Sequence, residues 1–154
     1  EPLRYFLLSQ IPTLDDGDFT VERFKENYQA DLANGLGNLV ARVAGLSKNC
    51  KFQIPKYKLG FSKKSEKHIE NYELSLAMEA IWDEIKKADI TINENEVWKL
   101  KGSQKQKVLD DLVVKIRQIA YDLKPFLPET SEKIEIQFKG PNIKSKNPLF
   151  PRLV

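Results

Sequence analysis

Leucine and valine side chains recur at helical spacing across residues 32–46, and this pattern constrains the fold more than any other feature of the sequence. Successive positions are four, three, four and three residues apart, which places them on one side of an α-helix. They are Leu32, Leu36, Leu39, Val43 and Leu46. A helix with such a stripe needs a partner surface that covers it. We therefore predict that this segment packs in the core of a helical domain.

Three other stretches have the same periodicity. We expect a short helix from Pro2 to about Ser9, a helix from near Ser65 to Ala88, and a long helix from about Ser103 to Leu123. Proline suits the first turn of a helix and disfavours helix in the residue before it, so Pro125 ends the last of these helices. A further short helix is expected at Pro128, and the helical pattern is interrupted over residues 89–96.

These elements predict an all-α fold, a bundle of about four main helices over residues 1–136 with an extended C-terminal tail over 137–154. The chain has 154 residues, which is enough for one domain with its own core. A single cysteine, Cys50, excludes an internal disulfide and a zinc site of several cysteines. No metal site and no catalytic constellation of nucleophile and base is predicted.

The charge and hydropathy of the chain narrow the choice of partners. The net charge of +3 is too small for a broad duplex-binding surface, so any nucleic-acid contact must be local. No apolar run approaches the ~20 residues of a membrane span, and the start lacks the basic region of a signal peptide. We expect a cytoplasmic protein without membrane contact. The sequence opens inside an amphipathic helix without an initiator Met, so we expect a piece of a longer chain.

One polar row and one tryptophan form the candidate site. Asn34, Asn38 and Arg42 follow one another at intervals of four beside the apolar stripe, and Trp98 follows the interruption at 89–96. An indole can stack on the face of an unpaired base, while an amide and a guanidinium can bond to its edge. The alternatives are a tryptophan at the rim of the core and an ordinary solvated helix surface.

The segment between residues 48 and 64 is expected to be a loop or an irregular hairpin rich in lysine. Lys51, Lys56 and Lys58 are accessory candidates for contact with RNA phosphates. A solvated loop is the alternative, and the sequence alone favours it.

Several runs of residues resemble the helical anticodon-binding domain of class I aminoacyl-tRNA synthetases, in particular that of the methionyl-tRNA synthetases. These runs occur in the family's order, and the match covers nearly the whole chain. They are Leu3-Arg4-Tyr5-Phe6-Leu7-Leu8, the long run from Asn27 to Arg42, Val97-Trp98-Lys99-Leu100, the run from Pro125 to Thr130, and Pro148-Leu149-Phe150-Pro151-Arg152. Two departures concern the Trp98 segment. Val97 stands where the family usually has proline, and Ala88-Asp89 stands where it generally has asparagine.

The resemblance implies a function. Trp98 would stack on the first base of the CAU anticodon of tRNA(Met), and Asn38 and Arg42 would hydrogen-bond to base edges. The family's two catalytic signatures do not occur in this sequence, so the resemblance implies no cofactor here, and ATP with Mg would bind the catalytic domain of the parent ligase. That domain is an expected partner, and the tail would pack on it or on the bundle. The alternatives are the equivalent domain of a leucine, isoleucine, valine or cysteine enzyme, or a helical protein-interaction domain that binds no RNA.

Overall fold

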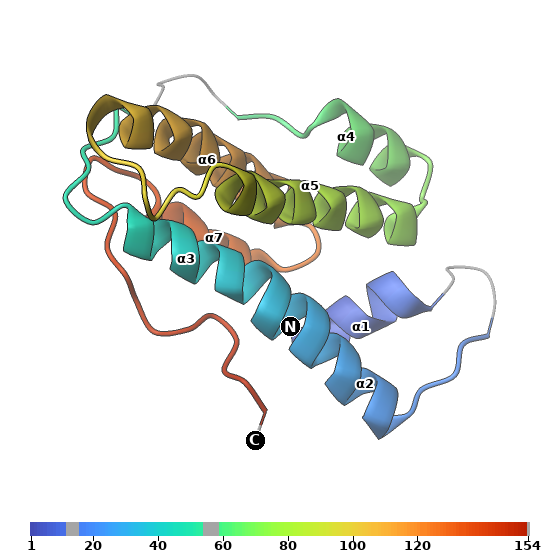
Figure 1. Ribbon diagram of the computed structural model, residues 1–154. Coiled ribbons are helices and arrows are strands. Elements are labelled where there is room, and N and C mark those ends of the chain that lie inside the picture. The colour runs from blue at the N-terminus through green and yellow to red at the C-terminus, as the bar shows by residue number, and fades with distance from the viewer. Residues whose placement is uncertain (12–15, 54–58, 154) are drawn as a thin grey trace.

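The structure is a computed structural model that describes residues 1–11, 16–53 and 59–153 of the chain. Every regular element in these residues is helical, as the sequence predicts, and Figure 1 shows the helices gathered into one bundle. In chain order the elements are α1 (Pro2–Gln10), α2 (Val21–Asn27), η1 (Tyr28–Gly37), α3 (Asn38–Leu46), α4 (Lys63–Glu70), α5 (Leu74–Glu94), α6 (Gly102–Leu123) and α7 (Pro128–Gln137).

The segment that carries the stripe at residues 32–46 belongs to one long helix, which is continuous from α2 through η1 to α3. Its middle part, η1, is wound more widely than an α-helix. Thr20 caps its start, since the Thr20 hydroxyl accepts a bond from the Arg23 N–H at 3.2 Å. In η1 the backbone follows the wider π-helical pattern, and the Asn38 N–H reaches the Ala33 carbonyl five residues earlier. Gly37 is needed here, because a Cβ at this position would lie 2.9 Å from the Leu32 carbonyl oxygen.

Two expectations about the middle of the chain are wrong. The helix expected from Ser65 to Ala88 is two helices, α4 and α5, and Ser62 caps the first of them. Between them the chain turns at Tyr72, which adopts a positive φ of 59°. The sequence gives no sign of this turn, because neither glycine nor proline occurs there. The interruption expected at 89–96 is also misplaced, because α5 continues to Glu94.

The core lies where α5 and α6 pack against η1 and α3. The apolar stripe of the long helix is buried as predicted, with Leu32, Leu36, Leu39 and Val43 at most 1% exposed and Leu46 partly buried. The opposing helices contribute apolar side chains that are at most 3% exposed, namely Met78, Ile81, Ile85, Ile92, Leu109, Leu112, Ile116, Ile119 and Leu123. Burying this apolar surface is what holds the helices together.

The C-terminal segment beyond α7 contacts the bundle. Figure 1 shows it running back along α3 and toward α2. The Phe150 ring packs edge to face on Tyr28 with centroids 6.2 Å apart, and the Tyr28 hydroxyl donates to the Pro151 carbonyl at 2.7 Å. The Leu153 N–H donates to the Gln29 side-chain oxygen at 3.0 Å. The segment therefore lies along the outer side of the long helix.

Candidate nucleic-acid interface

Asn38 and Arg42 stand one turn apart at the beginning and middle of α3. Leu39, Val40 and Val43 turn into the core, so the polar residues between them face outward at the edge of the buried stripe. Both side chains are partly buried rather than fully solvated. The hydrogen bonds found within the described residues include none made by the Asn38 amide. Its donors and acceptor therefore remain available to a ligand.

Two side chains of α5 hold the Arg42 guanidinium in place. Nη1 of Arg42 donates to the Asp89 carboxylate, and Nη2 donates to Oδ1 of Asn93 at 2.7 Å. Asn93 in turn donates to Asp89 at 3.2 Å, which closes a three-membered network. Asp89 and Asn93 are one turn apart on α5, so both face α3. Because the sequence indicates an interruption here, neither residue is predicted as part of the site.

Trp98 lies in the connection between α5 and α6, a few residues beyond this network. Its side chain is 51% exposed, whereas Val97 beside it is completely buried. The Val97 N–H donates to the Ile92 carbonyl at 3.2 Å, a bond that proline at this position could not make. Val97 thus anchors the connection in the core and turns the next side chain outward. Trp98 therefore lies at the surface rather than in the core.

The arrangement brings an exposed indole and a fixed guanidinium to the same end of the bundle. Figure 1 shows the end of α5 and the connection after it beside the C-terminal half of α3. A guanidinium has five N–H groups, and the bonds to Asp89 and Asn93 use its two terminal nitrogens without exhausting their hydrogens. The carboxylate partner fixes the plane of the fork, so the remaining N–H groups point in set directions.

The predicted row of three polar residues is regular only between Asn38 and Arg42. Asn34 belongs to η1, where the wider winding means that four residues no longer complete a turn. It is exposed and lines a shallow cleft with Gln29 and Leu153. Asn34 is therefore displaced from the edge on which the other two stand, and its accessory role stays a prediction.

The lysines predicted as accessory contacts are only partly placed. Lys51 is exposed in the segment that follows α3, while Lys56 and Lys58 lie outside the described residues. Lys63, Lys64 and Lys67, which follow in the sequence, are on α4 and so at the other end of the bundle (Figure 1). Lys51 and the lysines of α4 therefore do not share one surface.

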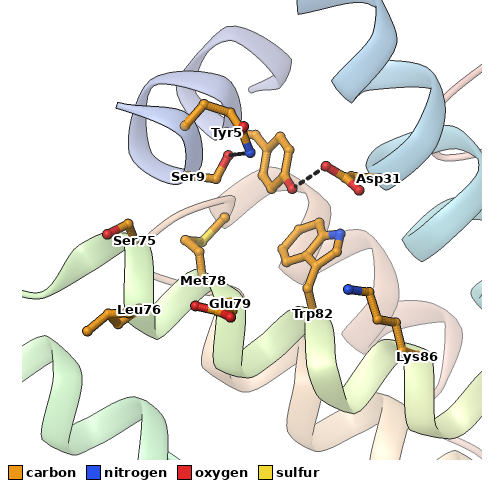
Figure 2. Close-up of a pocket in the computed structure, with 10 residues that line it drawn as sticks. Tyr5, Ser9, Asp31, Ser75, Leu76, Met78, Glu79, Trp82 and Lys86 are labelled. Carbon is orange, nitrogen blue, oxygen red and sulfur yellow. Dashed lines mark hydrogen bonds between the residues drawn. The ribbon is translucent and has the colours of Figure 1, made fainter. Parts of the chain in front are cut away.

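A separate cleft of about 270 Å³ lies between α1, η1 and α5. Figure 2 shows the Tyr5 hydroxyl bonded to Asp31 above the Trp82 indole. The Tyr5 and Trp82 rings are 4.5 Å apart at their centroids, which ties α1 to α5. The cleft also carries the Glu79 carboxylate. The carboxylates of Asp31 and Glu79 would repel the negatively charged RNA backbone. We interpret the cleft as part of the contact that holds α1 against α5.

Nothing in the described residues suggests a metal site or a membrane segment. Across residues 1–11, 16–53 and 59–153, no group of three or more histidine, cysteine, aspartate or glutamate side chains could hold a metal ion. Within the same ranges, no helix combines the length and the apolar character needed to cross a bilayer.

Sequence comparison finds relatives along almost the whole chain. A family model described as "tRNA synthetases class I (M)" matches residues 1–44. The methionine–tRNA ligase of Clostridium acetobutylicum is 36% identical over a match that covers 89% of this chain and 24% of that protein. That of Bacillus subtilis is 33% identical, with 99% of this chain and 29% of that protein covered. The chain thus spans about a quarter of the length of the curated relatives it matches.

Solved structures share the fold. The free-state crystal structure of Mycobacterium tuberculosis methionyl-tRNA synthetase superposes with a TM-score of 0.80 and 23% identity, covering 99% of this chain and 39% of that one. The sequence relatives and the family match place the chain among the class I aminoacyl-tRNA synthetases. Within that class it belongs to the methionyl-tRNA synthetase family, of which it represents one helical part.

Proposed function

We propose that this chain is the anticodon-binding domain of a methionine–tRNA ligase and that it recognises the CAU anticodon of tRNA(Met). The observation that supports this most directly is the Arg42 guanidinium, fixed by Asp89 and Asn93 on α5 close in sequence to the exposed Trp98. A fixed donor fork and a flat apolar face are the two parts that recognition of an unstacked base requires. The relatives' name, methionine–tRNA ligase, indicates which anticodon is bound.

The two parts would contribute differently. Stacking on Trp98 supplies affinity of about 1–3 kcal/mol per base, but it accepts any base because every base has a face. Discrimination needs hydrogen bonds that only one base can accept. Cytosine offers a ring nitrogen and a carbonyl oxygen as acceptors, and the Asn38 amide and the Arg42 fork can both donate. A different first base leaves these donors unsatisfied, at about 1–3 kcal/mol.

The chain supplies recognition, and the parent enzyme supplies the reaction. We propose that a catalytic domain of the same protein binds ATP with Mg and attaches methionine to the tRNA in the cytoplasm. The chain spans about a quarter of the relatives' length, which leaves room for such a domain. No side chain described here takes part in that chemistry.

Equilibrium binding to RNA stem-loops tests the proposal. The chain should bind a CAU stem-loop more tightly than stem-loops in which only the first anticodon base is changed, and Trp98→Ala and Arg42→Ala should each weaken binding to CAU. Arg42→Ala should also reduce the difference in affinity between stem-loops that differ in the first anticodon base. Trp98→Ala should instead lower the affinity for all of these stem-loops by a similar factor. Equal binding of every anticodon by the unmodified chain would refute the proposal, and failure to bind any stem-loop would refute it and favour a protein-interaction domain. Preference for a leucine, isoleucine, valine or cysteine anticodon would instead assign the domain to another class I enzyme.

A further inference from the structure

A groove of about 540 Å³ lies between the C-terminal end of α3 and the segment that follows α7. One wall comes from the end of α3 and the residues after it, including Lys48, Asn49 and Lys51. The other wall comes from residues about a hundred positions later, including Asn142, Lys144 and Ser145. Three ammonium groups, two amides and a hydroxyl therefore surround one hollow.

The groove has no negative charge of its own. No aspartate or glutamate lines it, and its three lysines are exposed and make no ion pair with any residue that the structure describes. Two of the carbonyl groups at the end of α3 already accept hydrogen bonds. Val43 accepts bonds from the Ser47 N–H at 2.9 Å and the Ser47 hydroxyl at 2.7 Å, and Gly45 accepts one from the Lys48 N–H at 3.3 Å. The groove thus presents chiefly hydrogen-bond donors and positive charge.

Hydrogen bonds and buried side chains fix the two walls relative to each other. The Phe52 N–H donates to the Pro141 carbonyl at 2.9 Å, and the Gln137 amide donates to the Lys144 carbonyl at 2.9 Å. The Phe52 and Ile143 side chains, next to these bonds, are 3% and 4% exposed. The shape of the groove is therefore set before any ligand binds.

The groove continues the edge of α3 that carries the candidate base-binding residues. Asn38, Arg42 and Gly45 are at positions i, i+4 and i+7 of one α-helix, so they lie in one row, and Gly45 lines the groove. Gly45 is about 5 Å farther along the helix axis than Arg42. A strand whose base is held at Asn38 and Arg42 would reach the groove with its neighbouring backbone.

We propose that this groove binds backbone phosphates of the RNA strand that adjoins the recognised base, an inference that rests on the proposed function. Lysine ammonium groups and neutral N–H and O–H donors are the groups that contact phosphate without reading sequence. The groove therefore adds affinity and fixes the register of the strand, while Asn38, Arg42 and Trp98 select the base. Lys48 and Lys144 carry its charge from opposite walls.

The first test compares two charge-matched double variants. Lys48→Ala with Lys144→Ala removes two of the three groove lysines, one from each wall. Lys63→Ala with Lys67→Ala removes two exposed lysines from α4 at the other end of the bundle (Figure 1). Binding of the CAU stem-loop is measured over a range of KCl concentrations. Loss of two phosphate contacts should reduce the slope of log K against log salt by about 1.4, since single strands give about 0.7 per contact. The ratio between CAU and first-base variants should stay unchanged, and the α4 variant should bind like the unmodified chain.

A second test places one charge in the groove without removing a lysine. A Cβ at Gly45 would meet no atom within 4 Å, so the position accepts a side chain. Gly45→Glu and Gly45→Gln have the same size and differ in charge, and only the glutamate should weaken binding, by about tenfold at low salt. Circular dichroism confirms that the variants are folded.

The outcomes separate the groove from the proposed function. If the unmodified chain discriminates CAU but the groove and α4 variants have the same salt slope, the groove is not a phosphate site and the proposed function stands. Equal binding by Gly45→Glu and Gly45→Gln also rejects the groove. If the unmodified chain does not discriminate CAU, the proposed function fails, and with it the assignment of the groove to the strand beside a recognised base.

Discussion

The Arg42 guanidinium on α3 donates to the Asp89 carboxylate on α5, 47 residues later in the chain. This contact fixes the Arg42 guanidinium of the candidate base site. Oδ1 of Asn93 accepts a second bond from the same guanidinium. An asparagine could accept a bond from Arg42 but would carry no charge, so the carboxylate holds the fork more firmly.

We expect Asp89→Ala to weaken discrimination between CAU and other first bases. Without the carboxylate the guanidinium can rotate, and the loss should be about 1–2 kcal/mol of the difference in binding free energy. Asp89→Asn should retain much of the discrimination, because its amide oxygen still accepts a bond. Asp111→Ala, at an exposed position on α6, is the control. Unchanged anticodon ratios in Asp89→Ala would show that the contact does not position Arg42.

Substitutions of Trp98 should separate binding from stability. The side chain is 51% exposed, so Trp98→Ala should change the free energy of unfolding by less than about 0.5 kcal/mol. The same variant should bind the CAU stem-loop about tenfold more weakly, whereas Trp98→Phe, which keeps a ring, should recover part of the loss. Calorimetric titration and urea unfolding measure the two quantities. A large loss of stability in Trp98→Ala would mean that the indole mainly supports the fold.

Glu1 should stabilise the bundle by capping α7. Its carboxylate accepts bonds from the Glu129 N–H at 2.7 Å, the Thr130 N–H at 3.0 Å and the Thr130 hydroxyl at 2.6 Å. A negative charge at a helix N-terminus also interacts favourably with the helix dipole. Glu1→Ala should lower the free energy of unfolding by about 1 kcal/mol, as for loss of other N-caps. Glu132 is exposed on the same helix, so Glu132→Ala should change the free energy of unfolding very little. If the two variants have the same free energy of unfolding, Glu1 does not stabilise α7.

The Tyr5 hydroxyl should make stability depend on alkaline pH. Burial raises the pKa of Tyr5 above its usual value, and the Asp31 carboxylate that accepts its hydrogen bond at 2.9 Å raises that pKa further. The phenol of the unfolded chain ionises near pH 10, so this contribution to stability is present below that pH and is lost above it. The loss approaches about 1.4 kcal/mol for each further pH unit.

The comparison with Tyr5→Phe isolates this effect, because phenylalanine cannot ionise while the lysines titrate in both chains. Urea unfolding between about pH 9 and 11 should show a steeper decline for the unmodified chain than for Tyr5→Phe. Parallel declines would indicate that Tyr5 ionises in the folded chain as easily as in the unfolded one.

Local pattern predicts most of the helices but not every boundary. The stripe from Leu32 to Val43 and the apolar face of α6 are visible because helical periodicity is a property of neighbouring residues. The break at Tyr72 carries no glycine or proline, so its positive φ has no local signal. The π-helical winding of η1 is likewise hidden, since the same residues also suit an α-helix.

The polar residues near the end of α5 show why the candidate site is only partly predictable. Asp89 and Asn93 look like helix-breaking residues in a sequence with several asparagines, yet they remain helical because they face Arg42. Hydrogen bonds across two helices offset their weak helix propensity. The pattern of neighbouring residues cannot indicate a hydrogen-bond partner that lies 47 residues away in the chain.

The spacing of apolar residues along single segments is enough to predict that the chain is helical and which face of its long helices is buried. The contacts that hold Arg42, the outward turn of Trp98 beside the buried Val97, and the groove shared by Lys48 and Lys144 depend instead on how the elements pack. These relationships join residues from different helices and the tail. They exist only once burial of the core has set those elements side by side.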